Sequence, residues 1–312
     1  MQERIVFMGT PDFAAEVLES LINKGYHIVA AVTQEDKKTG RKQILTPPPV
    51  KLMAQKYGIP VLQPHRIRKE YDEVLSYKPD LIVTSAYGQI IPKVLLDAPK
   101  YGCINTHASL LPKYRGAAPI QRAIMNGEKE TGMTIMYMNE KMDEGDIIEQ
   151  KILPIDEKDT NTILFKKLAG MTCEMLPGII DRIFEGMVNA VPQDHSQATL
   201  APMLQKEEEF VSFDEDIHAV YDHIRGLLDD PGAYGILEGR KYKFLDVFYE
   251  EKENTDPGLF RGLEKDHLQI DAKNGILYIY TIKPEGKNAM PAKAFWNGAG
   301  KSLAGKKFQN TL

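Results

Sequence analysis

The sequence predicts an α/β fold, in which a Rossmann-like, mostly parallel sheet domain is followed by a small OB-like antiparallel β-barrel domain. In the first half of the chain, short apolar runs alternate with segments whose apolar residues recur at helical spacing. After Pro231 and Gly232 the apolar period changes to two, and several short strand-like runs follow within about 80 residues. The length of 312 residues suits two ordinary domains.

The first half begins with an apolar run at residues 5–8 that stops at Gly9, as expected of a buried strand. Residues 12–24 carry apolar side chains three and four positions apart, which predicts a helix. Further strands are expected at 27–32, 60–62, 81–84, 103–107, 134–138 and 147–152. Further helices are expected at 49–57, 67–77 and 160–185. Alternation of this kind predicts a doubly wound sheet.

The boundary between the two domains is expected in the polar stretch 190–206, which contains two prolines and has weak periodicity. This linker would separate a first domain at 1–189 from a second domain at 207–312. A helical pattern at 216–228 opens the second domain. An Asn-Gly pair at 274–275 lies between two strand-like runs and predicts a hairpin.

Composition excludes several classes of protein. Hydrophobic residues make up 43% and charged residues 27% of the chain, which excludes a disordered chain and a fibre. No apolar run reaches the roughly 18 residues of a membrane helix, and the first residues lack the pattern of a signal peptide. Only two cysteines, Cys103 and Cys173, are present, which excludes a disulfide framework and favours a reducing cytoplasm. Nothing in the sequence demands more than a monomer.

Charge is segregated along the chain. The net charge of −5 argues against a uniformly basic nucleic-acid binder. Residues 273–312, however, contain seven lysines against the single acid Glu285, so this end carries about +6 and the remainder about −11. A basic end on a small barrel suits docking of RNA without base readout, although basic tails also serve solubility alone.

A basic segment at 34–51 is long for a connection within an α/β unit. Its cations are Lys37, Lys38, Arg41, Lys42 and Lys51, set against Glu35 and Asp36. Such a loop beside a ligand-binding edge fits contact with a phosphate backbone. The alternative is an ordinary solvated surface loop.

Asn105 and His107 are the first candidates for chemistry. They are two residues apart at the end of an expected strand, so both side chains face the same side of the sheet. The carboxyl end of a strand in an open α/β sheet is where ligands usually bind. An amide beside an imidazole can hold a developing oxyanion while the imidazole handles a proton. From spacing alone, the favoured interpretation is a pair at the strand end that only makes hydrogen bonds to the backbone.

An acidic turn at 142–146 is the second candidate. Its sequence, Met-Asp-Glu-Gly-Asp, lies between two strand-like runs and suits plain hairpin chemistry. In a functional interpretation, Asp143 is the carboxylate that orients the histidine. Metal binding is disfavoured because the H-E-x-x-H, C-x-x-C and D-x-D-x-D-G patterns are missing. NAD binding is disfavoured because Gly9 to Asp12 do not match G-x-G-x-x-G.

Residues 109–121, Ser-Leu-Leu-Pro-Lys-Tyr-Arg-Gly-Ala-Ala-Pro-Ile-Gln, closely resemble the signature of the folate-dependent formyltransferases. The Asn-x-His at 105–107 and the acidic turn are similar to the other catalytic motifs of that family. Residues 40–42 and 47–51 resemble the tRNA-contacting insertion of the members that act on charged tRNA. Residues 284–298 resemble the closing motif of their C-terminal barrel. The resemblance runs from Ile5 to about Phe308.

The resemblance implies transfer of the formyl group of 10-formyltetrahydrofolate to the α-amino group of methionine esterified to initiator tRNA. It implies catalytic roles for Asn105 and His107 as oxyanion donors and for Asp143 in orienting the histidine. The residues implied for the folate are Ser109, Leu110, Leu111, Pro112, Tyr87, Gly88, Gln89, Ile90 and Ile91. The cations expected at the tRNA are Lys37, Lys38, Arg41, Lys42, Lys287, Lys301 and Lys306.

Two points stay open at this level. A sugar-nucleotide formyltransferase uses the same folate chemistry and can carry a similar second domain, but would lack the basic insertion at 40–42. Arg115 is placed to meet either a carboxylate or a phosphate. The chain also departs from the family at 228–234, where Leu-Asp-Asp-Pro-Gly-Ala-Tyr stands in place of Asn-Pro-Trp-Pro-Gly-Ala-Tyr.

Overall fold

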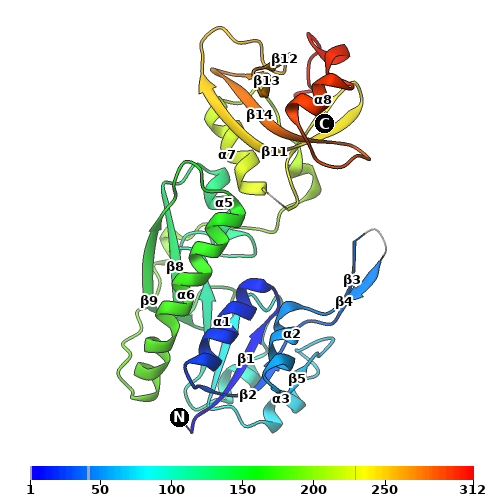
Figure 1. The fold of residues 1–312 in the computed structure, drawn as a ribbon. Helices are drawn as coiled ribbons and strands as arrows, with labels where there is room; N and C mark the ends of the chain where they lie inside the picture. Colours follow the sequence, from blue (N-terminus) through cyan, green and yellow to red (C-terminus); the bar gives the residue numbers. More distant parts are fainter. Residues whose placement is uncertain (1, 41–42, 229) are drawn as a thin grey trace. The chain divides into compact units, whose positions relative to one another are not determined.

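The computed structural model describes residues 2–40, 43–228 and 230–312, which form two compact units (Figure 1). Unit 1 contains the residues up to Pro119, Thr131–Pro154 and Phe165–Pro202. Unit 2 contains Ile120–Glu130, Ile155–Leu164 and Met203–Leu312. This division differs from the expected domain bounds, because most of the stretch 190–206 lies in unit 1 and two segments of the expected first domain, 1–189, lie in unit 2.

Unit 1 is built on a seven-stranded sheet in the order β5-β2-β1-β6-β7-β8-β9. The pairs β1–β2, β2–β5, β1–β6 and β6–β7 are parallel, whereas β7–β8 is antiparallel. The strands are β1 (Arg4–Gly9), β2 (His27–Val32), β5 (Val61–Leu62), β6 (Leu81–Ser85), β7 (Cys103–His107), β8 (Glu130–Tyr137) and β9 (Ile147–Pro154). The mostly parallel sheet predicted from the apolar runs is therefore confirmed.

Helices cover both faces of this sheet. They are α1 (Asp12–Asn23), α2 (Pro49–Lys56), α3 (Asp72–Ser76), α4 (Lys93–Asp97) and the part of α6 (Asn161–Phe184) from Phe165 onward. Helix α5 (Pro119–Met125) belongs to unit 2 from Ile120 onward. Figure 1 shows α1 and α6 side by side, where the rings of Phe13 and Phe165 pack edge to face with centroids 5.3 Å apart. On the other face Val6 and Met8 of β1 join a buried cluster with residues of α3 and α4. Period-two alternation along β1 thus sends side chains to two cores.

Two local expectations need correction. The helix expected at 67–77 shortens to α3, and 66–70 forms a separate turn in which the N–H of Glu70 donates to the carbonyl of Arg66 at 3.0 Å. The basic segment 34–51 contains an unexpected antiparallel hairpin, β3 (Lys37–Thr39) and β4 (Ile44–Thr46). Arg41 and Lys42 lie outside the described residues.

Unit 2 contains an antiparallel sheet in the order β10-β11-β14-β13-β12, with β15 paired to β14, which confirms the all-antiparallel second domain. The strands are β10 (Tyr234–Leu237), β11 (Arg240–Glu251), β12 (Phe260–Glu264), β13 (His267–Ala272), β14 (Gly275–Pro284) and β15 (Met290–Pro291). The helices are α7 (Ile217–Leu227) and α8 (Ala292–Asn297), with 3-10 turns η2 (Lys206–Glu209) and η3 (Gly300–Leu303); a further turn, η1 (His195–Gln197), belongs to unit 1. The expected hairpin joins β13 and β14, with Asn274 in the left-handed region at φ 60°.

One irregularity changes the inward face of β11. The period-two pattern predicts that Tyr242, Phe244 and Asp246 share a face, and the first two are buried. A bulge between Phe244 and Val247 then shifts the register against β14, so that Val247 is buried and Asp246 is exposed. The bulge keeps a carboxylate out of the core.

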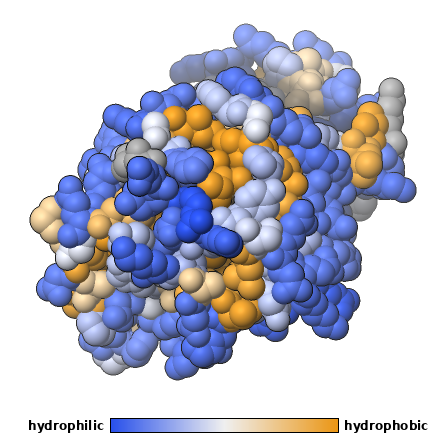
Figure 2. Space-filling view, turned by 90° about the horizontal axis from the view of Figure 1, so that it is seen from below, coloured by the Kyte–Doolittle hydropathy of each residue, from blue (hydrophilic) through white to orange (hydrophobic). Residues whose placement is uncertain are grey.

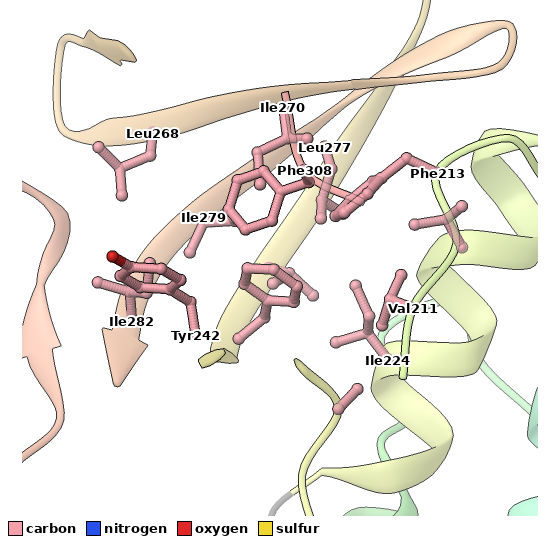
Figure 3. Packing of buried hydrophobic residues seen from close by; sticks show 14 of the residues in the cluster. Val211, Phe213, Ile224, Tyr242, Leu268, Ile270, Leu277, Ile279, Ile282 and Phe308 are labelled. Atoms are coloured by element: carbon pink, nitrogen blue, oxygen red, sulfur yellow. The ribbon is translucent and has the colours of Figure 1, made fainter. Parts of the chain in front are cut away.

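The core of unit 2 is a cluster of aromatic and branched residues (Figure 3). Phe308 lies at its centre, with its ring centroid 5.4 Å from that of Phe213 and 5.9 Å from that of Phe244. Helix α7 covers this core with Ile217, Val220, Ile224 and Leu227 and is capped at its start by Asp216, which accepts from the N–H of His218 at 3.0 Å.

The surface in Figure 2 is largely hydrophilic, with hydrophobic residues gathered in a few patches rimmed by hydrophilic ones. Within the described ranges, no helix has both the length and the apolar character needed to cross a membrane.

Candidate active site

The candidate site lies where three parallel strands end at the same edge of the sheet. Strands β1, β6 and β7 are neighbours, and Gly9, Ser85 and His107 are their last residues. The chain runs outward from β1 to β2 and β5 and then returns to place β6 on the other side of β1. The carboxyl edge at such a reversal of strand order is the usual ligand position in open α/β sheets.

Asn105 is held by the neighbouring strand. It is paired in register with Thr84, whose hydroxyl donates to Asn105 Oδ1 at 2.7 Å. Because Oδ1 is occupied, the Nδ2 group is the donor end that the side chain presents. Asn105 is partly exposed at the carboxyl edge. The side chain is therefore arranged as a neutral hydrogen-bond donor, as expected from the sequence.

His107 is 6% exposed, and each of its ring nitrogens faces an oxygen that can only accept. Nε2 donates to the backbone carbonyl of Tyr114 at 2.9 Å, and Nδ1 lies 3.6 Å from Oδ2 of Asp143. The structure thus brings His107 and Asp143 together, and the Tyr114 carbonyl occupies Nε2 of the histidine.

Asp143 also fixes the signature loop. Its Oδ2 accepts from the backbone N–H of Gly116 at 2.9 Å. Gly116 has φ 128°, and a Cβ there would lie 2.5 Å from the carbonyl oxygen of Ala201, so only glycine fits. One carboxylate oxygen therefore ties together the histidine and the loop that resembles the formyltransferase signature.

The acidic turn that carries Asp143 is closely packed against β8. The N–H of Tyr137 donates to the carbonyl of Asp146 at 2.9 Å. A Cβ on Gly145 would lie 1.7 Å from the carbonyl oxygen of Tyr137. Gly145 is therefore required by the close approach of two backbones, which the sequence pattern did not reveal.

The expected folate-binding segment 109–112 is fixed through its backbone. Thr134 donates to the carbonyl of Ser109 at 2.6 Å and accepts from the N–H of Leu111 at 3.2 Å. Gln150 donates to the carbonyl of Leu111 at 2.8 Å. Ser109 and Leu111 are buried, whereas Leu110 and Pro112 are partly exposed. Surface for a ligand is therefore offered by Leu110 and Pro112.

The second expected folate segment, 87–91, follows β6. The Tyr87 side chain is buried in the core beside α4, where burial raises the pKa of its hydroxyl, and its carbonyl accepts from Thr10 at 2.9 Å and Gln34 at 3.0 Å. Gly88 has φ 83° and is exposed, as is Ile90. Ile91 is buried, and the Gln89 side chain bonds to the 64–67 turn. The surface offered to a ligand is therefore backbone at Gly88 together with the Ile90 side chain.

Arg115 meets a carboxylate of its own chain. It is 5% exposed, and its Nη1 lies 3.3 Å from Oε1 of Glu144. Its Nε and Nη2 donate to Oε1 of Gln193 at 3.2 and 2.7 Å. Arg115 therefore cross-links the acidic turn to a segment that was expected to be a linker.

Three residues that hold the site were missed by sequence reasoning: Thr84, Thr134 and Gln193. Each acts through a hydrogen bond to a residue distant in the chain, and such a bond leaves no trace in periodicity. A signal existed only for Thr84, which ends an apolar run beside the expected ligand edge.

The cations expected at a tRNA differ in their surroundings. Lys38, Lys287 and Lys301 are exposed. Lys37 donates to Gln34 at 2.6 Å, and Lys306 is paired with Glu238 at 2.9 Å. Among the described residues, no group of three or more His, Cys, Asp or Glu side chains is arranged to hold a metal ion.

Comparison with protein families places both units. The model of the formyl transferase family matches residues 3–180, and that of the formyl transferase C-terminal domain matches residues 203–300. The chain is 45% identical over 303 residues to the methionyl-tRNA formyltransferase of Lysinibacillus sphaericus, which covers 96% of this chain and 97% of that protein. It is 47% identical over 307 residues to the methionyl-tRNA formyltransferase of Geobacillus thermodenitrificans, which covers 96% and 95%.

Solved structures share the fold. An N-formyltransferase from Helicobacter canadensis, in complex with folinic acid and dTDP-3-aminofucose, matches with a TM-score of 0.69 at 18% identity, covering 89% of this chain and 99% of that one. HypX from Aquifex aeolicus, in complex with tetrahydrofolic acid, matches with a TM-score of 0.67 at 18% identity, covering 95% and 47%. With matches to both of its domains and this identity to full-length relatives, the chain belongs to the formyl transferase family.

Proposed function

We propose that the chain transfers the formyl group of 10-formyltetrahydrofolate to the α-amino group of methionine on charged initiator tRNA. The observation that carries this proposal is the identity of 44–47% to methionyl-tRNA formyltransferases over nearly the whole chain. The site geometry supports it, because a neutral donor and a histidine–carboxylate pair lie at one ligand-binding edge.

In the proposed reaction the neutral amine attacks the formyl carbon, and a new C–N bond forms while the carbonyl electrons move to oxygen. The resulting oxyanion accepts a hydrogen bond from Nδ2 of Asn105. Collapse breaks the bond between the formyl carbon and the folate nitrogen, which takes up one proton as the attacking nitrogen gives one up. A free α-amino group has a pKa of about 7.7–8.0, so a useful fraction, roughly a tenth, is already neutral near pH 7 and no strong base is needed.

His107 and Asp143 are proposed to manage the proton. The Asp143 carboxylate, 3.6 Å from Nδ1, orients the ring, and the ring in its protonated form can donate to the oxyanion from Nε2 or protonate the departing nitrogen. In the described structure Nε2 bonds to the Tyr114 carbonyl, so the proposal requires that this bond be exchanged when substrates bind.

The folate is proposed to lie along 109–112 and 87–91. Partly exposed Asn105 is the register partner of Thr84 at the carboxyl edge of the sheet, and the exposed backbone at Gly88 follows Thr84 four residues later on the same edge. The glycine lets a flat ring approach the backbone closely. The residues present therefore fit a pterin bound mainly through main-chain groups and the apolar side chains of Leu110 and Ile90.

The tRNA is proposed to contact the exposed lysines of the β3–β4 hairpin, Lys37 and Lys38, together with Arg41 and Lys42, and in unit 2 Lys287, Lys301 and Lys306. Lysines of this kind neutralise phosphates without reading bases. Lys306 is expected to contribute least, because Glu238 already pairs with it. A monomeric protein acting in the cytoplasm is part of the same proposal.

The test is an acceptor comparison with the purified protein and 10-formyltetrahydrofolate. We expect formylation of charged initiator tRNA, slower formylation of elongator methionyl-tRNA, and no reaction with an amino-sugar nucleotide. Transfer only to the sugar nucleotide would overturn the proposal in favour of a sugar-nucleotide formyltransferase.

A further inference from the structure

We propose that Gln193 is a positioning residue for formyl transfer, which holds the turn that carries Asp143 against His107. The inference rests on the proposed function, because it assigns Gln193 a role through the proposed catalytic carboxylate. Nothing in the sequence pattern marks Gln193, which lies in the polar stretch expected to be a linker.

Every polar atom of the Gln193 side chain is used. The residue is 6% exposed. Its Nε2 donates to the backbone carbonyl of Asp143 at 2.9 Å and to that of Gly145 at 2.8 Å, and its Oε1 accepts twice from Arg115. The amide orientation is therefore fixed, because the reverse orientation would set donors against a guanidinium and an acceptor against two carbonyls. A buried amide with this fit defines the position of the turn.

Arg115 holds the same turn from a second direction. Its Nη1 is paired with Glu144, the residue between the two carbonyls that Gln193 binds. The Arg115 backbone is itself fixed, since its N–H donates to Thr199 at 2.9 Å and its carbonyl accepts from Ala201 at 2.7 Å. Gln193 and Arg115 thus clamp three consecutive residues of the turn.

The clamp bears on Asp143 because that residue has an unfavourable backbone conformation. Its φ is 55°, in the left-handed region that non-glycine residues seldom adopt. Such a conformation persists only where the surroundings fix it. With its carbonyl released, Asp143 is expected to leave this conformation and to move its carboxylate away from Nδ1 of His107 and from the Gly116 N–H.

The experiment compares Gln193→Ala with Gln197→Ala in the full chain, with charged tRNA and 10-formyltetrahydrofolate. Gln197 is the matched control, an exposed glutamine on the same segment whose side chain donates to the neighbouring Ser196 at 3.5 Å. We expect Gln193→Ala to lower kcat by about 10- to 100-fold with little change in KM for folate, since small displacements of catalytic groups have effects of this size. Gln197→Ala should match the unchanged protein.

The decisive readout is the effect of Gln193→Ala in an Asp143→Ala background. If Gln193 acts through Asp143, the second substitution should lower kcat no further. Two losses that multiply would overturn the inference, because a general loss of structure acts whether or not the carboxylate is present. Hydrogen exchange of the 142–146 turn should also quicken in Gln193→Ala and not in Gln197→Ala.

Gln193→Glu covers the case in which Gln193→Ala does not fold. It keeps the acceptor for Arg115 and loses both donors to the turn, so it should also lower kcat; wild-type kcat would overturn the inference. The inference is separable from the proposed function. If the wild-type protein formylates no tRNA, the proposed function is contradicted. If Gln193→Ala is fully active while Asp143→Ala has low activity, only the role of Gln193 is contradicted.

Discussion

The hydroxyl of Thr84 donates to Oδ1 of Asn105 at 2.7 Å, across two neighbouring parallel strands. An asparagine amide has one acceptor end and one donor end, and an oxyanion is stabilised only by the donor end. The pairing of β6 with β7 therefore decides which end of Asn105 faces the ligand edge. Oxyanion stabilisation is built into the strand register before any substrate binds.

Thr84→Val should lower kcat by about 10-fold and leave KM for folate nearly unchanged. Valine fills the same volume but cannot donate, so the Asn105 amide is free to turn its oxygen toward the reacting carbonyl. Thr84→Ser, which keeps the hydroxyl, is the control and should retain most of the activity. Steady-state kinetics of both variants measure the effect, and wild-type kcat in Thr84→Val would remove the orienting role.

Asn105→Ala should reduce kcat by about 100- to 1,000-fold, which corresponds to about 2.7–4 kcal/mol for a single oxyanion donor. KM for the folate should change much less, because the interaction is made mainly in the transition state. Single-turnover formylation at saturating folate is the measurement. A variant that keeps kcat and raises only KM would show that Asn105 binds the ground state.

Strand ends and the period of two were enough to predict the pair at the heart of the site. Asn105 and His107 both lie at the carboxyl end of β7, as their spacing required, and the acidic turn brings Asp143 to His107. Gln193 was not predictable, because its partners Arg115 and Asp143 are 78 and 50 residues away. The sequence pattern of a polar stretch with prolines is the same whether the stretch is an exposed linker or buries a polar side chain such as that of Gln193.

The bulge in β11 shows where a correct local pattern gives a wrong detail. It arises where continued alternation would bury Asp246, and burying an unpaired charge is costly. At this point the cost of burial in the folded chain overrules the period of two.

Lys38→Ala in the β3–β4 hairpin should raise KM for charged tRNA several-fold and leave folate kinetics unchanged. Each lost phosphate contact should also make the dependence of binding on salt less steep, by about one unit of logarithmic slope. Lys306→Ala should have a smaller effect, since Glu238 is its partner at 2.9 Å. Titrations of tRNA binding over a range of salt test this, and equal slopes for Lys38→Ala and wild type would exclude the hairpin contact.

Gly145→Ala should be strongly destabilising and nearly inactive. The added Cβ would lie 1.7 Å from the Tyr137 carbonyl oxygen, and the backbone there cannot move without displacing the turn of Asp143. Gly170→Ala in α6 is the matched control, because its Cβ would meet no atom within 4 Å. Removing a helix-interior glycine should stabilise by about 0.5–1 kcal/mol. Thermal unfolding compares the two; an undiminished melting temperature in Gly145→Ala would contradict the packing described for the turn.

His223 of α7 should make unit 2 less stable as the pH falls below about 6.5, the ordinary histidine value. Burial lowers the pKa of His223, and the charge of Arg122 lowers it further. The hydrogen bond from His223 to the Glu208 carbonyl at 2.8 Å and the charge of Glu208 act in the opposite direction but are outweighed. As the pH falls, the unfolded chain therefore binds a proton on this histidine before the folded chain does. The free energy of unfolding is highest above the pKa of the unfolded chain, and it decreases as the pH falls from that value toward the lower pKa of the folded chain.

His223→Gln, which retains a side-chain donor, should flatten this decline between about pH 6.5 and 5. Glu208 does not obscure the comparison. The Arg122 guanidinium holds the pKa of that carboxyl below its usual range, so its own loss of stability comes at lower pH. The measurement is urea unfolding of the wild type and the variant at intervals of half a pH unit. Each free energy of unfolding is compared with its value at pH 8, where His223 is neutral in the folded and the unfolded chain, which gives the pH dependence of stability for each protein. Parallel curves would mean that His223 takes up its proton equally well in the folded and unfolded chain, and that burial by α7 and the 206–209 turn does not set its charge.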